Sequence, residues 1–157
     1  MTKKQSYQYE YHHLQLDEHQ ADIQTMSLSH EAQQQLGQLV IRTMPGLGAV
    51  DENQRVCAYW VIQQMEKAGC VIAKRHTQGP VTLVSMGSVS FKKRLAADDL
   101  VSFYVQCQAI GRTSITVEVY VYVQPAYAYE AYYVTEATLV LAHIDQQGQA
   151  MEINHYS

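Results

Sequence analysis

Strand-like alternation of apolar and polar residues fills most of the chain after residue 80. The clearest example alternates Ile and Val with Thr, Glu and Tyr through residues 113–124, a two-residue period that predicts a strand with one buried face. Other runs rich in Val, Thr, Tyr and Ile also have strand propensity. We therefore expect strands at 81–91, 100–109, 113–124 and 132–145, and an earlier one at 39–44 that stops at the Pro- and Gly-containing loop 45–48.

One long segment, residues 53–74, has the 3.6-residue period of a helix. Its apolar side chains share one broad arc of the helical projection: Cys57, Ala58, Trp60, Val61, Met65, Ala68 and Ile72. Its polar stripe consists of Arg55, Tyr59, Gln63, Glu66 and Cys70. Asp51 followed by Gln54 resembles a capping box, so we interpret Asp51 as the cap of this helix.

The predicted order is one strand, one long helix and four further strands joined mostly by short links. This order predicts an α+β fold, in which a curved antiparallel sheet holds the helix on one face. Residues 1–38 differ from the rest, because they are dense in Gln, His and acidic side chains. We interpret 1–38 as a polar extension, with a short helix from Ser29 to Gln38, and 39–157 as the folded domain.

Composition and charge narrow the class of protein. The 157 residues carry a formal net charge of -4, so we expect no nucleic acid bound through a broad basic face. The mean hydropathy of -0.23 and the lack of a long apolar run predict no membrane span. The three cysteines show no C-x-x-C spacing and no secretory signal is visible, so we expect reduced thiols and a cytoplasmic location.

Five short motifs occur in an order that resembles a known family. They are Arg-Thr-Met-Pro-Gly at 42–46, the run from Trp to Gly at 60–69, Ser-Val-Ser-Phe at 88–91, Gly-Arg-Thr-Ser-Ile-Thr at 111–116 and Val-Thr-Glu-Ala at 134–137. Through them the chain is similar to the bacterial acyl-CoA thioesterases of the hotdog fold. The resemblance implies a long central helix wrapped by a curved antiparallel sheet. It also implies a homodimer with a continuous sheet, often assembled further into a hexamer.

The same resemblance implies an activity. Members of the family hydrolyse an acyl-CoA thioester at a site shared between two subunits. The expected products are a fatty acid and coenzyme A. We expect no metal and no separate cofactor, because coenzyme A is part of the substrate.

The loop that enters the helix departs from the family pattern, which reads Asn-x-Asn-Gly-Asp, an apolar pair, Gly-Gly and Trp. With the two aligned on Trp60, the family's catalytic Asp falls at Arg55 and the Asn before it at Asn53. The two glycines are replaced by Ala58 and Tyr59. A guanidinium stays protonated at ordinary pH and cannot take a proton from water, so hydrolysis would need another base.

Two carboxylates are candidates for that base. Glu66 matches the helix carboxylate of the phenylacetyl-CoA and hydroxybenzoyl-CoA type of hotdog thioesterase, with Asn53 or Gln63 orienting water and the thioester carbonyl. A solvated Glu66 that pairs with a nearby Lys or Arg is an equally open interpretation. Asp51 is the alternative base, because the loop is longer than the family's and could carry it to the thioester.

Two basic segments are candidates for binding coenzyme A. Arg112, with Thr113 and Ser114, lies where the family meets the phosphates or the pantetheine arm. Lys93 and Arg94, in the basic run after the predicted strand 81–91, form a second cluster that could hold a polyanionic ligand; Arg55 is a further candidate. The alternative is a charge run that only solubilises the end of a strand.

The remaining patterns have simpler interpretations. His12, His13 and His19 lack a matching ligand set, so we interpret them as part of a solvated tail and expect no metal site. The tyrosines at 120, 122, 127, 129, 132 and 133 are interpreted as sealing the sheet or a subunit interface. The sequence thus predicts an acyl-CoA thioester hydrolase. The alternative is a hotdog subunit that binds acyl-CoA, or assembles, without hydrolysing it.

Overall fold

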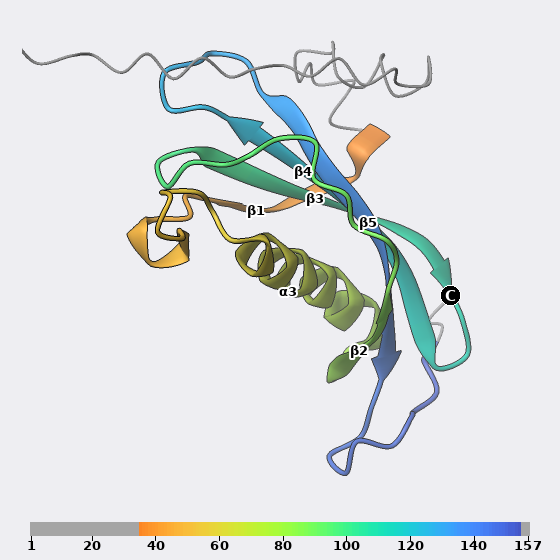
Figure 1. Ribbon diagram of the computed structural model, residues 1–157. Helices are drawn as coiled ribbons and strands as arrows, with labels where there is room; N and C mark the ends of the chain where they lie inside the picture. The colour runs from red at the N-terminus through yellow and green to blue at the C-terminus, as the bar shows by residue number, and fades with distance from the viewer. Residues whose placement is uncertain (1–34, 155–157) are drawn as a thin grey trace, which may run out of the picture.

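The computed structural model describes residues 35–154, which form a five-stranded sheet and one long helix (Figure 1). The strands are β1 (Gln38–Thr43), β2 (Val81–Met86), β3 (Leu100–Ile110), β4 (Ser114–Gln124) and β5 (Tyr132–His143). They lie side by side in the order β1-β3-β4-β5-β2, and every pairing is antiparallel. The 3-10 turn η1 (Leu47–Ala49) and the helix α3 (Ala58–Thr77) connect β1 to β2.

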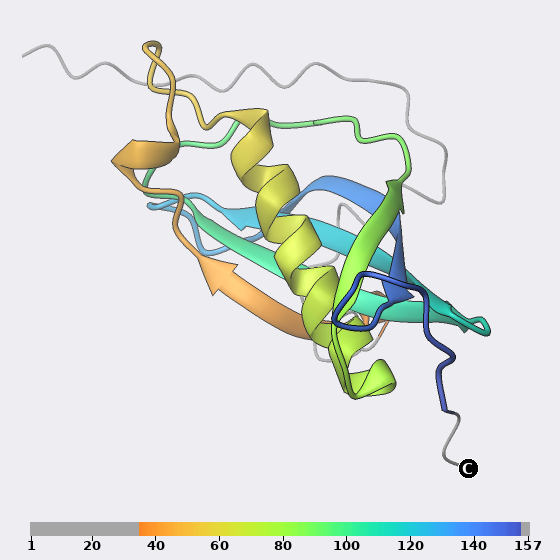
Figure 2. The same cartoon turned by 90° about the horizontal axis from the view of Figure 1, so that it is seen from below.

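Helix α3 crosses the concave face of the sheet, which curves around it (Figures 1 and 2). Its buried residues are Trp60, Val61, Met65, Ala68, Gly69, Ile72, Ala73 and Thr77. This arrangement confirms the predicted α+β fold, with a long helix wrapped by a curved antiparallel sheet. No helix within residues 35–154 is long and apolar enough to cross a membrane.

The helix begins at Ala58, five residues later than the periodicity predicts. Its N-cap is Cys57, which has extended backbone and makes no side-chain capping hydrogen bond. The prediction that Asp51 caps the helix is therefore wrong. Gln54 has a φ of 60°, a left-handed conformation that interrupts helical structure between Asp51 and the helix. As a result Cys57 and Ala58, which we expected on the buried arc, are partly or fully exposed.

Strand β2 also ends earlier than predicted, at Met86 instead of residue 91. The chain leaves the ladder there and is held to β5 by isolated bonds. The Thr135 hydroxyl donates to the carbonyl of Ser90 at 2.9 Å, and the Lys92 N–H donates to the carbonyl of Val134 at 2.9 Å. The basic run that follows Phe91 therefore lies on a loop between β2 and β3 rather than at the end of a strand.

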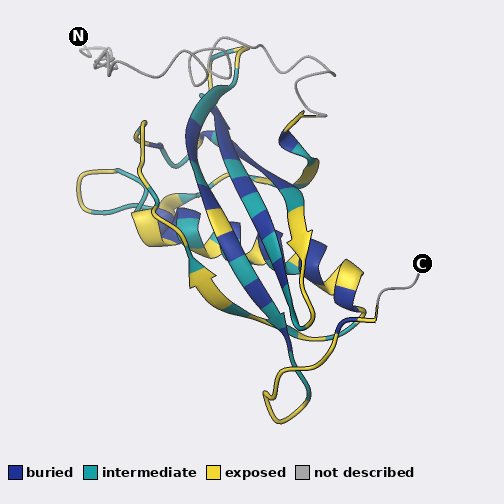
Figure 3. Ribbon diagram, turned by 90° about the vertical axis from the view of Figure 1, so that its right-hand side faces the viewer, coloured by how far each residue is buried: buried dark blue, intermediate teal, exposed yellow. Residues whose placement is uncertain are grey.

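Strand β4 shows the predicted alternation between the two faces of the sheet (Figure 3). Val117 and Val119 are completely buried under the helix, while Glu118 between them lies on the outer face. Gly69 allows the helix to come close at this place. A Cβ atom there would lie 3.1 Å from the Leu139 Cδ2 atom and 3.4 Å from the Val117 Cγ2 atom.

Tyrosines line part of the outer face of the sheet. Tyr122 meets Tyr104 and Tyr133 edge to face, with ring centroids 6.0 and 5.9 Å apart. Tyr122 and Tyr133 thus seal the sheet as predicted. Tyr127 and Tyr129 differ, because they lie on the β4–β5 loop and are 97% and 101% exposed. They cover no part of the sheet within one chain.

The chain reaches β1 across this outer face. Leu36 is 6% exposed and packs with Tyr104 and Tyr122. Of the short helix predicted from Ser29 to Gln38, Gln35 and Leu36 are helical, whereas Gln38 belongs to β1. Ser29 lies outside the described residues, as do the three histidines interpreted as a solvated tail. The division into a 1–38 extension and a 39–157 domain stays a prediction.

We predict that Gly37→Ala destabilises the protein more than Gly148→Ala. Both glycines have positive φ, of 84° and 79°, so each substitution costs about 1–2 kcal/mol of backbone strain. Only at Gly37 would the new Cβ collide with the chain, 2.3 Å from the carbonyl oxygen of Val105. We expect this overpacking to add about 1–3 kcal/mol.

Urea denaturation of both variants at one protein concentration measures the difference. Equal free energies of unfolding for the two variants would contradict the close packing of Gly37 on β3.

Candidate active site

A cavity of about 280 Å³ opens at the amino-terminal end of α3. Three segments line it: the loop that leads into the helix, the first turns of the helix, and part of the β2–β3 loop. Its lining residues are Asp51, Arg55, Val56, Cys57, Ala58, Val61, Phe91, Lys93, Arg94 and Leu95. The cavity therefore combines an apolar floor with one carboxylate and three basic side chains.

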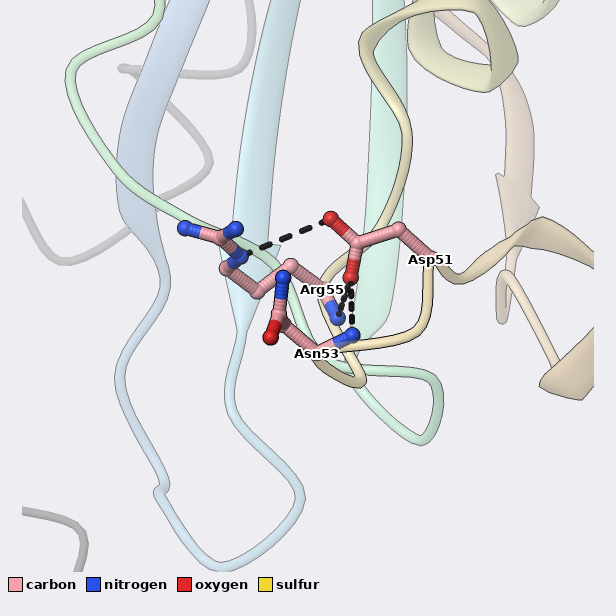
Figure 4. Close-up of polar contacts among 3 residues, drawn as sticks. All are labelled: Asp51, Asn53 and Arg55. Carbon is pink, nitrogen blue, oxygen red and sulfur yellow. Dashed lines mark hydrogen bonds and ion pairs between the residues drawn. The ribbon is translucent and has the colours of Figure 1, made fainter.

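Asp51 organises the loop at one wall of this cavity (Figure 4). Its Oδ1 atom accepts the backbone N–H groups of Asn53 at 2.8 Å and Arg55 at 3.0 Å. Its Oδ2 atom lies 3.5 Å from Nε of Arg55. The carboxylate thus closes a short turn before the helix, which explains why it does not reach the helix itself.

These contacts also set the protonation behaviour of Asp51. The backbone N–H of Arg55 is the largest influence that lowers the pKa of this carboxyl, with smaller contributions from the Asn53 N–H and the Arg55 charge, against a partial opposing effect of burial. A carboxylate whose pKa is lowered holds a proton weakly. Asp51 is consequently a poor general base while this turn is intact.

The Arg55 side chain is partly exposed and partly buried. Its side chain is 41% exposed, yet its Nε atom is buried and has no hydrogen-bond partner, since the 3.5 Å contact with Asp51 is an ion pair without hydrogen-bond geometry. An Asp at this position would place a second carboxylate beside Asp51. The guanidinium replaces that repulsion with attraction and brings a positive charge to the wall of the cavity.

Lys93 and Arg94 line the cavity from the β2–β3 loop. The Lys93 ammonium lies 3.6 Å from the centroid of the Tyr132 ring, a cation–π contact. Burial lowers the pKa of Lys93. The structure thus brings together Arg55, Lys93 and Arg94, three of the predicted coenzyme A residues, although their binding role stays a prediction.

Glu66 and Gln63 lie further along the helix. Glu66 is half-buried and Gln63 is exposed, and neither belongs to the residues that line the cavity. Within residues 35–154 no ion pair joins Glu66 to Lys or Arg, so the pairing that we considered for it is not formed. Burial, and then the neighbouring Glu66 charge, raise the pKa of the Cys70 thiol on the same stripe.

Arg112, Thr113 and Ser114 lie at the other end of the sheet, in and beside the β3–β4 turn (Figures 1 and 2). Arg112 makes an ion pair with Glu152 at 2.9 Å, with 79% and 68% of the two side chains exposed. Within one chain the two predicted coenzyme A sites are therefore separated by the length of the sheet.

The predicted site residues do not include six residues that line the cavity: Val56, Cys57, Ala58, Val61, Phe91 and Leu95. Cys57 was expected to face the core, and its exposure follows from the late start of the helix. Phe91 was placed in a strand, although an aromatic residue directly before three basic ones was a usable signal. Among residues 35–154 no group of three His, Cys, Asp or Glu side chains could hold a metal ion.

Comparisons with known proteins agree with this fold. Residues 60–127 match the model of the thioesterase superfamily. A Haemophilus influenzae protein named "uncharacterized acyl-CoA thioester hydrolase" is 31% identical over 123 residues, which cover 76% of this chain and 80% of that protein. The acyl-CoA thioester hydrolase YciA of Escherichia coli is 28% identical over 127 residues, or 79% of this chain and 95% of the relative.

Solved structures extend the likeness to three dimensions. The hexameric broad specificity acyl-coenzyme A thioesterase HI0827 has a TM-score of 0.74 and 30% identity, covering 77% of this chain and 84% of its own. The hexameric thioesterase y2039 of Yersinia pestis has a TM-score of 0.71 and 29% identity, covering 76% of this chain and 98% of its own. A hexameric hotdog fold thioesterase of Campylobacter jejuni, 24% identical with a TM-score of 0.70, shares the fold. The chain therefore belongs to the acyl-CoA thioester hydrolases of the thioesterase superfamily and has the hotdog fold.

Proposed function

We propose that this protein hydrolyses acyl-CoA thioesters to a carboxylic acid and coenzyme A. The observation that carries the proposal is the convergence of Arg55, Lys93 and Arg94 on one cavity at the start of α3, in a chain of net charge -4. Such a local cluster suits the phosphates of coenzyme A, which an acidic surface would otherwise repel. Relatives named acyl-CoA thioester hydrolases support the same substrate.

The proposed reaction needs a nucleophilic water, a base and a place for the developing negative charge. Water loses a proton to the base and bonds to the thioester carbon, and the carbon–sulfur bond then breaks to release coenzyme A. Backbone N–H groups at the first helical positions, Ala58 and Tyr59, have no acceptor within the helix and would stabilise the oxyanion. No cofactor is needed, since coenzyme A arrives as part of the substrate.

Glu66 is the base that we propose, and Asp51 is the alternative. Asp51 already accepts two backbone N–H groups and pairs with Arg55, so it is occupied in holding the turn. Glu66 does not hold a turn in this way. It lies outside the cavity of a single chain, however, and would have to act in a part of the site that a second subunit completes. Asn53 and Gln63, both exposed, are proposed to orient water and the carbonyl.

A second function has one specific observation in its favour. The place of the family's catalytic Asp is taken by Arg55, whose ion pair with Asp51 engages the nearest carboxylate. A subunit with this loop could bind acyl-CoA, or simply assemble, without hydrolysing it. The catalytic experiment below distinguishes this alternative from the enzyme.

We propose that the site is completed by another copy of the chain, in a homodimer or a larger assembly such as a hexamer. Strand β2 pairs with β5 on one side only, and Val84 on it is 61% exposed. Antiparallel pairing of two β2 edges turns one subunit end for end relative to the other. The Arg112 end of one subunit would then lie beside the cavity end of its neighbour, which the relatives described as hexameric thioesterases support.

Two further assignments belong to the same proposal. The three cysteines of the described chain are free, which suits a reducing cytoplasm. We also propose residues 39–157 as the catalytic domain and 1–38 as an extension of it.

We predict that Glu66→Gln lowers the rate of acyl-CoA hydrolysis by about 10²- to 10⁴-fold, because the amide keeps the shape but cannot accept a proton. Steady-state assays over a series of acyl-chain lengths measure the effect. Asp51→Asn is the matched comparison, since it removes the same charge at the alternative base. If Glu66→Gln is fully active and Asp51→Asn is not, the base is Asp51.

The same assays on Arg55→Asp test the second function. An inert wild type that gains hydrolysis on this substitution would identify the chain as a lapsed binding subunit.

We predict that Arg112→Ala weakens the binding of free coenzyme A by about 1–3 kcal/mol, the contribution of a lost charge-assisted hydrogen bond. The exposed pair with Glu152 contributes little to folding, so the variant should stay folded. Arg75→Ala is the control. It also removes an exposed cation, from the last turn of α3, at the same end of the molecule as Arg112. Calorimetry that gives both variants the wild-type dissociation constant would remove Arg112 from the site.

We predict that the protein is at least a dimer and that Val84→Lys dissociates it. A charge on β2 opposes edge-to-edge pairing. Leu39→Lys, on the other edge strand β1 and 39% exposed, should leave the assembly intact. Light scattering that returned 17.8 kDa for the wild type at micromolar concentration would exclude both the assembly and the shared site.

A further inference from the structure

Asp99 is a buried carboxylate that the proposed reaction does not use. It precedes β3, at the end of the β2–β3 loop, and is 3% exposed. Among residues 35–154 it is the only Asp or Glu in the buried class. Burying a charge is costly unless the surrounding groups compensate it, so its partners indicate what the residue does.

The partners of Asp99 are backbone N–H groups of two loops. Its Oδ2 atom accepts the N–H of Ala96 at 2.8 Å, and its own N–H donates to the carbonyl of Ala96 at 3.2 Å. Burial raises the pKa of Asp99, and the Ala96 N–H opposes the rise. The backbone N–H of Ala126, in the β4–β5 loop, also lowers the pKa of this carboxyl. The carboxylate thus closes the turn 96–99.

The backbone at 95–97 is also hydrogen-bonded to the loop that carries Asp51 and Arg55. The Gly46 N–H donates to the carbonyl of Ala97 at 2.8 Å, and the Val56 N–H donates to the carbonyl of Leu95 at 3.0 Å. The two bonds hold the loop on either side of its Asp51–Arg55 turn. One wall of the cavity is therefore fixed by the backbone at 95–97.

The two basic residues from the β2–β3 loop are next to the same segment in the chain. Lys93 and Arg94 directly precede Leu95, which is 5% exposed, belongs to the core and lines the cavity. A shift of the turn 96–99 would move these basic residues and release the bonds to Gly46 and Val56 together. Through the backbone at 95–97, the turn closed by Asp99 thus joins the segment that carries Lys93 and Arg94 to the loop that carries Arg55.

We propose that Asp99 is a positioning residue, which holds the Arg55 wall and the Lys93–Arg94 wall at the spacing that binds the anionic part of the substrate. The identity of that substrate as acyl-CoA rests on the proposed function. Asp99 does not contact the cavity and takes no part in proton transfer. Its role is to keep the cations in place before the ligand arrives, which lowers the cost of ordering them on binding.

The test compares Asp99→Asn with Asp98→Asn, which removes the same charge from an exposed neighbour. Asn keeps the shape of Asp99 but loses the charge and turns an N–H₂ group toward one of the two donors. In the free protein we expect amide hydrogen exchange at Gly46, Val56 and Ala96 to rise about tenfold or more in Asp99→Asn, with β4 unchanged. We expect the dissociation constant of free coenzyme A to rise about 5- to 50-fold. Asp98→Asn should change neither quantity.

Two results would overturn the proposal: unchanged exchange at Gly46 and Val56, or exchange that rises equally in the core strands, which would mean general destabilisation. If Asp99→Asn does not fold, Asp99→Ser, whose hydroxyl can accept one N–H, is measured in the same way. Wild-type protein that fails to bind coenzyme A would refute the proposed ligand, while the exchange data still decide the role of Asp99.

Discussion

The whole structure depends on the contact between helix α3 and the concave face of the sheet. Met65 and Ala68 are fully buried there, and Gly69 brings the helix axis close to Val117 and Leu139. A side chain larger than hydrogen at Gly69 would press on those two residues, so the helix has little freedom to slide or roll. Its amino-terminal end is therefore held at a definite place relative to the ends of the strands.

The candidate site is built on that fixed helix end, but from loops. The helix contributes its first turn, and the loops around Asp51 and Lys93 contribute the charges. Loops lack a ladder of their own, so their positions depend on single hydrogen bonds, several of which converge on the turn closed by Asp99. The helix thus gives the site a rigid support, while hydrogen bonds at the turn closed by Asp99 hold its loops.

The loop that enters the helix joins a carboxylate to a guanidinium. The backbone N–H groups of Arg55 and Asn53, and then the Arg55 charge, stabilise Asp51 in the ionised form. This arrangement weakens proton acceptance by Asp51. For this reason we propose Glu66 as the general base, in a site that a neighbouring subunit completes.

The sequence alone determined the elements whose residues have a strict period. The alternation in 113–124 and the apolar arc from Trp60 to Ile72 predicted β4 and the buried side of α3, because periodicity follows directly from backbone geometry. The convergence of Arg55, Lys93 and Arg94 was decided only by the tertiary structure, as was their separation from Arg112. Local pattern also misplaced the helix start, because the N–H groups that Asp51 accepts belong to a turn and not to the helix. Such contacts depend on how the backbone folds in three dimensions. The periodicity of the sequence carries no information about that.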